Sequence, residues 1–148
     1  MLLFRKYIMI IIGLFFASSM MMAQDYDGCD LPDFNLAILE DGSVIYNSSE
    51  AIGGFQFDFN DVTINGASGG DAAAAGLLIQ AGSTTVLGFS LSGASIPPGC
   101  GVLFELDLSG PPMSVEFVIS SPVGSELPFE YYTGEIAGCM NTNACNYN

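Results

Sequence analysis

The stretch Phe55-Gln56-Phe57-Asp58-Phe59 decides the fold class, because large apolar side chains alternate strictly with polar ones along it. A period of two places every second side chain on the same face of a β-strand. Residues 102–108, 115–119 and 127–132 repeat the alternation, with Val102, Phe104, Leu106 and Leu108 on one predicted face of the second stretch. Strands of this kind bury one face against a core, so we expect Phe55, Phe57 and Phe59 to be core residues.

Shorter apolar segments raise the expected number of strands to about nine. They lie at residues 36–39, 44–47, 62–65, 77–80 and 86–91, separated by turn sequences such as Asp41-Gly42 and Asn65-Gly66. The run Asp71-Ala72-Ala73-Ala74-Ala75 predicts one helical turn with Asp71 as its N-cap. Many short strands with regular turns predict an all-β protein, a β-sandwich, with a closed barrel as the alternative.

Charge is distributed one-sidedly along the chain. The sequence holds 16 acidic residues, two basic residues and no histidine, and both basic residues, Arg5 and Lys6, lie near the N-terminus. The remainder therefore lacks the histidine of a Ser-His-Asp relay, the lysine of a Schiff base and any cation for phosphate. Nucleic acid and anionic lipid surfaces would be repelled, so we expect neither as a partner.

Residues 1–23 read as a secretory signal peptide. Arg5 and Lys6 precede an apolar run from Tyr7 to Phe16, and Ala23 stands directly before a polar, acidic stretch. A retained membrane anchor is the alternative interpretation. We therefore expect a secreted or cell-surface protein that has no membrane association after cleavage, with residues 24–34 as an acidic leader.

Export places the four cysteines in an oxidising compartment, where disulfides persist. Four cysteines allow three pairings. We favour Cys139–Cys145, because these two lie close together, which leaves Cys29–Cys100 to tie the N-terminal part of the exported chain to a mid-chain loop. A zinc site is disfavoured because the chain has no histidine and no C-x2-C spacing.

Three blocks together resemble cohesin modules. A glycine-rich start leads into the aromatic strand at residues 52–59, residues 85–90 and 101–108 resemble the paired central strands, and residues 115–128 resemble the last hairpin. The resemblance implies a nine-stranded jelly-roll sandwich over residues 35–136 without catalytic activity. Docking of a dockerin module, the best-known role of that family, is not carried over to this chain.

Residues 137–148 have a different composition, which is small, polar and rich in asparagine. The sequence Ala144-Cys145-Asn146-Tyr147, after Gly138-Cys139, is similar to the beginning of a Cys-rich repeat of large secreted proteins from marine bacteria. The similarity implies a linker or the start of such a repeat, and we expect the chain to be part of a longer protein.

Acidic residues supply the candidate polar sites. Glu105 and Asp107 share one face of a strand, and we interpret them as a solvated sheet face rather than a glycosidase pair. A Ca²⁺ site is a hypothesis for loop oxygens, and the leader is interpreted as disordered rather than as a cation site; no other cofactor is expected. The loop residues are Asp58, Asn60, Asp61, Asn65 and Asp71, and the leader residues are Asp25, Asp27, Asp30 and Asp33.

Phe129, Tyr131 and Tyr132 form the candidate platform for a sugar. Combined with the resemblance, the sequence favours a secreted, non-catalytic cohesin-like module for adhesion, scaffolding or protein–protein interaction within a larger extracellular or cell-surface protein. Its expected partner is another extracellular protein module. The alternative function is a carbohydrate-binding module of a polysaccharide-degrading system, with a polysaccharide as ligand.

Overall fold

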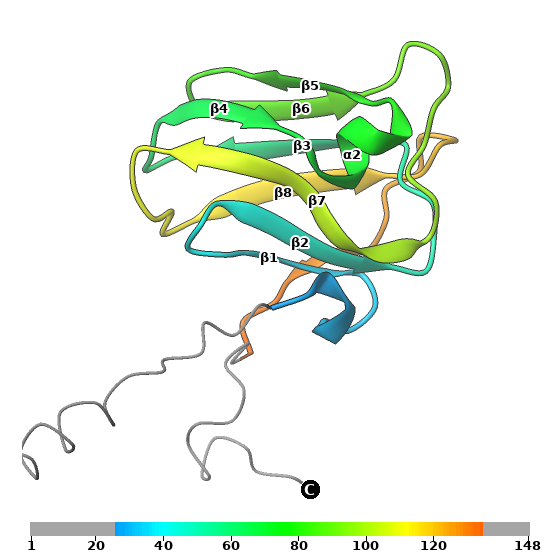
Figure 1. The fold of residues 1–148 in the computed structure, drawn as a ribbon, viewed down its shortest axis with the longest axis horizontal. Helices are drawn as coiled ribbons and strands as arrows, with labels where there is room; N and C mark the ends of the chain where they lie inside the picture. Colours follow the sequence, from blue (N-terminus) through cyan, green and yellow to red (C-terminus); the bar gives the residue numbers. More distant parts are fainter. Residues whose placement is uncertain (1–25, 135–148) are drawn as a thin grey trace, which may run out of the picture.

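The computed structural model describes residues 26–134, which form two β-sheets packed face to face (Figure 1). One sheet has five strands in the order β4-β7-β2-β1-β9, and the other has four strands in the order β5-β6-β3-β8. The predicted all-β sandwich of about nine strands is confirmed. The elements are η1 (Gly28–Asp30), β1 (Asn35–Ile38), β2 (Ser43–Ser48), β3 (Gly54–Phe59), β4 (Ile64–Ser68), α2 (Gly70–Ala75), β5 (Leu78–Ala81), β6 (Thr85–Phe89), β7 (Gly99–Leu108), β8 (Val115–Ser120) and β9 (Glu130–Tyr131).

The connections hold the two sheets together as one unit. Only β1–β2 and β5–β6 are joined within a sheet, and every other connection crosses from one sheet to the other. Neighbouring strands are antiparallel except β1 and β9, which pair in parallel through Asn35 with Glu130 and Leu36 with Tyr131. The inner faces of the two sheets pack against each other, and the side chains between them form one main core cluster.

Aromatic rings fill the centre of the core. Phe55 and Phe104 stack across the two sheets with ring centroids 4.8 Å apart, and Phe57 contacts Phe104 edge-on at 5.2 Å. Phe57 and Phe59 are almost completely buried, so the predicted core role of the 55–59 stretch is confirmed. Gly88 in β6 lies under the Phe55 ring, where an added Cβ would meet ring carbons at 2.2 Å.

A β-bulge in β7 corrects the predicted alternation of residues 102–108. Val44 pairs with Phe104 but Ile45 pairs with Val102, so Leu103 is the extra residue. Leu103 and Phe104 are both buried in the main core, whereas Val102 packs in a smaller cluster with Leu31, Ala37 and Ile45. The prediction that Val102 shares the core face with Phe104 is wrong, because the bulge reverses the side-chain parity before it.

Three local predictions around β4 are also wrong. The strand expected at 62–65 is found at Ile64–Ser68, and Asn65-Gly66 is a register shift inside this edge strand rather than a turn. The helical turn is present as α2, but its N-cap is Gly69 and no side chain caps it. The Asp71 carboxylate instead accepts a hydrogen bond of 2.8 Å from the Tyr46 hydroxyl, which ties α2 to β2. Burial of the Tyr46 side chain, and after it this hydrogen bond, raises the pKa of Tyr46.

The end of the sandwich is less regular than the sequence predicts. Of the alternating stretch 127–132, only Glu130–Tyr131 forms a strand, because β1 offers it a parallel pairing of just two residues. Leu127 is buried all the same, and its N–H donates to the Ile119 carbonyl at 2.8 Å. Within residues 26–134, no helix has the length and apolar character needed to cross a bilayer.

Candidate functional site

The four-stranded sheet turns one face to the core and the other to solvent. Alternate residues of β3 and β6 are buried, and along β5 and β8 alternate residues are less exposed than their neighbours, so the remaining ones project outward. We call this the outer face. Its side chains are those of Gln56, Asp58, Leu78, Gln80, Thr85, Leu87, Phe89, Glu116 and Val118.

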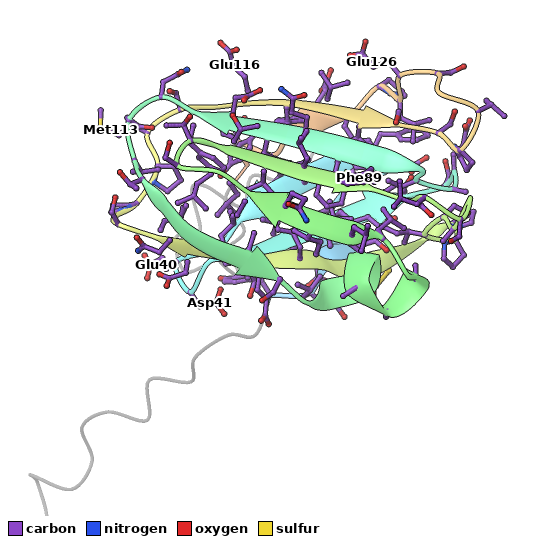
Figure 2. The ribbon with its side chains drawn as sticks, turned by 90° about the horizontal axis from the view of Figure 1, so that it is seen from above. Glu40, Asp41, Phe89, Met113, Glu116 and Glu126 are labelled. Carbon is purple, nitrogen blue, oxygen red and sulfur yellow. A yellow bond between two sulfur atoms is a disulfide. The ribbon has the colours of Figure 1, made fainter. Side chains whose placement is uncertain are left out.

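Four large apolar side chains project from the outer face, and we call them the apolar patch. Leu78 is the direct cross-strand partner of Phe89, and Phe89 is labelled in Figure 2. Leu87 and Val118 are the partners of Gln56 on its two sides. Their exposed fractions are 43% for Leu78, 40% for Leu87, 36% for Phe89 and 50% for Val118. Exposed apolar side chains that gather on one rigid face, unlike scattered ones, mark a surface for interaction.

One end of the outer face is negatively charged. Thr85, Asp58 and Glu116 form a single cross-strand row, next to the row of Leu87, Gln56 and Val118. Asp58 accepts hydrogen bonds from the Thr85 hydroxyl at 2.6 Å and from the Gln56 amide at 2.7 Å, and these bonds lower its pKa. Because residues 26–134 contain no Lys, Arg or His, this charge has no internal counterion.

The Asp58–Thr85 hydrogen bond predicts a pH-dependent stability difference. We expect Thr85→Val to lower the free energy of unfolding at neutral pH by less than about 1 kcal/mol, because water reaches Asp58 and screens its interactions. The lowered pKa of folded Asp58 means that this stabilisation is full above the unfolded pKa and is lost as pH falls through the folded pKa. Thermal melts of both proteins from pH 7 to about pH 2 measure the gap, which should close in acid.

Thr84→Val is the matched control, because Thr84 is exposed and, within residues 26–134, its hydroxyl has no hydrogen-bond partner. It should change the melting temperature little at every pH. A Thr85→Val gap that persists unchanged in acid would show that the effect comes from packing rather than from the carboxylate.

Sequence reasoning missed the apolar patch, although the sequence carried a signal for it. In the run 86–91, Val86, Leu87, Phe89 and Leu91 place apolar side chains on both parities of the strand. Odd- and even-numbered residues of a strand point to opposite faces, and only one face can pack on a single core. The apolar residues of the other face are therefore expected to be exposed. The exposed Leu91 and Val123 lie in the loops that follow β6 and β8, both at the same end of the sheet as Gly54.

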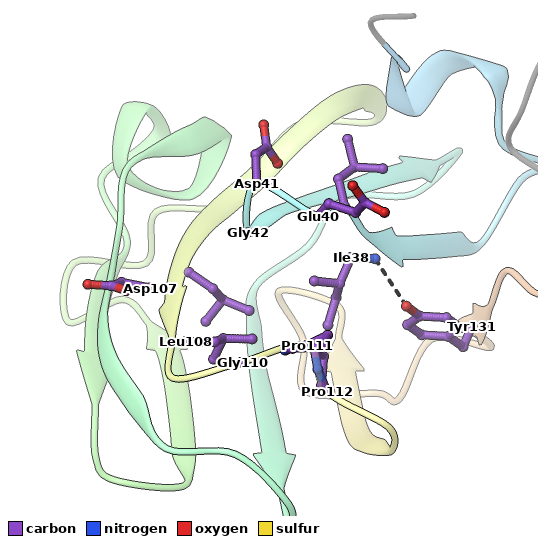
Figure 3. Close-up of a pocket in the computed structure, with 12 residues that line it drawn as sticks. Ile38, Glu40, Asp41, Gly42, Asp107, Leu108, Gly110, Pro111, Pro112 and Tyr131 are labelled. Atoms are coloured by element: carbon purple, nitrogen blue, oxygen red, sulfur yellow. Dashed lines mark hydrogen bonds between the residues drawn. The ribbon is translucent and has the colours of Figure 1, made fainter. Parts of the chain in front are cut away.

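A hollow of about 540 Å³ lies at one end of the sandwich, between the β1–β2 turn and the β7–β8 loop (Figure 3). Ile38, Leu108, Pro111, Pro112 and Tyr131 give it an apolar lining, and the Tyr131 hydroxyl accepts a hydrogen bond of 3.3 Å from the Ile38 N–H. Glu40, Asp41 and Asp107 stand at its border, and Figure 3 shows Asp107 pointing away from the prolines. The hollow therefore lacks a convergent set of polar groups.

The candidate Ca²⁺ ligands do not come together. Asp58 is engaged with Thr85 and Gln56, Asp71 with Tyr46, and Asp61 accepts from the Met113 N–H. Among residues 26–134, no three acidic or cysteine side chains gather closely enough to hold a metal ion. Glu105 and Asp107 are both exposed on β7, as expected for residues on a solvated sheet face.

The N-terminal part of the described chain is ordered, which corrects the prediction of a disordered leader for residues 26–34. Cys29 in η1 and Cys100 in β7 form the predicted disulfide, with their Cα atoms 4.9 Å apart. Leu31 is buried beside Ala37 and Ile45, and Asp33 accepts hydrogen bonds from the Ser49 N–H and hydroxyl. Asp25, the predicted Cys139–Cys145 pairing and the predicted signal peptide lie outside the described residues.

The three aromatic residues near the C-terminal end do not form one exposed platform. Phe129 packs edge-on against Phe34 with ring centroids 5.6 Å apart, and Tyr132 packs against the Leu31 cluster. Tyr131 alone of the three presents an exposed ring, with 38% of its surface accessible. A flat surface for stacking a sugar needs neighbouring rings, so this arrangement does not favour one.

Comparisons of this chain with protein-family models, with curated proteins and with solved structures found no match.

Proposed function

We propose that this chain is a non-catalytic interaction module of an extracellular or cell-surface protein, which binds a partner protein through its outer face. The observation that carries the proposal is the apolar patch. Leu78, Leu87, Phe89 and Val118 come from three of the four strands of one sheet and stand exposed on one face of it. Protein interfaces have this organisation, with an apolar centre surrounded by polar groups.

Charge narrows the class of partner. Asp58 and Glu116 border the patch, and no cation of residues 26–134 balances them. A partner with apolar side chains at its centre and Lys or Arg at its rim would complement both features. The resemblance to cohesin modules and the absence of histidine and lysine from the exported part both support a binding role over catalysis.

The test immobilises the secreted full chain and two of its variants. It measures how much partner protein each captures from the secreted proteins of the organism that makes the chain. The double variant Leu87→Asp/Val118→Asp places charges in the patch and should leave the fold intact, because both side chains project from the sheet. It should weaken capture of the partner by about tenfold or more, the loss expected when interface anchors are removed.

Met113→Asp is the matched control, since Met113 is 92% exposed but lies in the β7–β8 loop away from the patch. It should bind as the unmodified chain does. Equal binding by the unmodified chain and the double variant would overturn the proposal. So would retention on insoluble polysaccharides that the double variant does not reduce, which would favour the carbohydrate-binding alternative.

A further inference from the structure

Among residues 26–134, strand β8 is an edge strand of the four-stranded sheet. It pairs with β3 over its whole length, from Val115 opposite Phe59 to Ser120 opposite Gly54, and it ends the strand order on that side. In Figure 2, Glu116 points outward from β8 (pale orange) at one border of the molecule. The beginning of this edge, away from the Ser120–Glu126 bridge, is thus a place where a further strand can be added.

The backbone groups that face this edge can be assigned from their neighbours. The Ile119 carbonyl accepts from the Leu127 N–H, which lies on the side of β8 away from β3. Hydrogen-bonding groups alternate in direction along an antiparallel strand, so Val115 and Phe117 point their N–H and C=O groups to the same side. Among residues 26–134, no backbone group pairs with Val115 or Phe117 there.

The other three sheet edges are short or interrupted. β9 has two residues, β5 has four, and β4 contains the register shift between Ile64 and Gly66. β8 has six residues in unbroken register, without proline, glycine or a bulge, and only Glu116 carries a charge. The segment that follows β8 covers its edge at Ser120, which pairs with Glu126, and at Ile119, whose carbonyl accepts from Leu127. Natural proteins usually block strand edges with charges, bulges or prolines, so the uncovered residues 115–117 are a site for strand pairing.

We infer that the β8 edge binds an extended segment of another protein by strand addition, with its backbone paired to Val115 and Phe117. This inference rests on the proposed function only in taking the ligand to be a protein. Side chains of the added strand on the outer face would stand beside Val118 and Glu116, two residues apart. The matching segment therefore carries an apolar residue and a Lys or Arg at that spacing.

Charge favours a foreign strand over a second copy of this chain. A second β8 has no basic residue, and antiparallel pairing of two copies would add a Glu116 to a surface that already holds Asp58 and Glu116 without a counterion. Like charges on neighbouring strands destabilise the pairing, whereas Lys or Arg opposite Glu116 stabilises it.

The test uses a synthetic peptide of about eight residues, a usual strand length, with the repeat Lys-Thr-Val-Thr. The comparison peptide has the repeat Glu-Thr-Val-Thr. Hydrogen exchange of the Val115 and Phe117 amides is followed by NMR in the secreted full chain. Both amides should exchange fast in the free protein and slow by about tenfold or more with the lysine peptide, because pairing protects them. The glutamate peptide should leave them unchanged.

Two charge reversals distinguish pairing of the peptide with β8 from a general attraction between a basic peptide and an acidic protein. Glu116→Lys should reverse the peptide preference, whereas Glu40→Lys, an equal charge change in the exposed β1–β2 turn, should preserve it. Equal effects of both reversals, or peptide binding without amide protection, would overturn the inference. Slow exchange of Val115 and Phe117 in the dilute free protein would also overturn it, and protection that grows with protein concentration would identify a second copy as the occupant instead. The Leu87→Asp/Val118→Asp result does not enter this test, so the two proposals fail separately.

Discussion

Replacing Cys29 and Cys100 together by alanine should lower the free energy of unfolding by about 4 kcal/mol. The disulfide joins residues separated by 71 positions, and the loss of chain entropy that such a long loop imposes on the unfolded state accounts for this magnitude. For a domain of this size, the melting temperature should fall by about 15 °C. Thermal and urea denaturation followed by circular dichroism measure both quantities.

The folded state should lose order at a defined place as well. The disulfide holds η1 over β2 and β7, where Gly28 is buried and Leu31 covers Ala37 and Ile45. Asn47 adds one further tie, a hydrogen bond of 2.7 Å from its side-chain amide to the Leu31 carbonyl. Without the disulfide, amide exchange in β1 and β2 should accelerate more than in β3 and β6.

Alanine at Cys139 and Cys145 is the matched control for the loss of two cysteines. It should leave the melting temperature within a few degrees of the unmodified chain. If instead this variant and the Cys29/Cys100 variant melt alike, the 71-residue link would not be the main covalent contribution to stability.

The fold class was predictable because the alternation of the 55–59 and 115–119 stretches depends only on the period of a strand. What could not be predicted is where that period is interrupted. The bulge at Leu103 gives no signal in the sequence, since Val102, Leu103 and Phe104 are all apolar and any two of them can face the core. Only the pairing with Val44 and Ile45, which are distant in sequence, selects the parity.

Local turn chemistry was misleading for a related reason. Asn65-Gly66 favours a turn in isolation. In the folded chain it is a register shift within β4, an edge strand that pairs with β7. Asp71 favours an N-cap in isolation, but the Tyr46 hydroxyl reaches its carboxylate from β2. In both cases a tertiary contact outweighs a preference worth about 1 kcal/mol.

The candidate site was partly visible in the sequence and partly not. The apolar residues of the patch could be read from the double parity of the 86–91 run, but their assembly depends on the strand order, which brings β8 beside β3. The cysteine pairing followed from sequence proximity and was confirmed for Cys29–Cys100. The aromatic platform failed because Phe129 and Tyr132 find packing partners in Phe34 and the Leu31 cluster.

Replacing a core phenylalanine and a surface phenylalanine by alanine should lower the free energy of unfolding by very different amounts. Phe57→Ala should destabilise the protein by about 3–5 kcal/mol, and Phe89→Ala by about 1 kcal/mol or less. Phe57 is fully buried and its ring contacts those of Phe55, Phe104 and Phe117, so its removal leaves a cavity that rigid strands from both sheets cannot close.

Phe89 has the same side chain on the opposite face of the same sheet, with 36% of its surface exposed. Water fills the space that its ring leaves, so no cavity forms and the lost burial is partial. Urea denaturation of both variants measures the difference, and a Phe89→Ala loss close to that of Phe57→Ala would mean that the patch is needed for folding. A small loss combined with weakened partner capture would assign the exposed ring to binding, because a surface residue that contributes little to stability is free to be selected for contact.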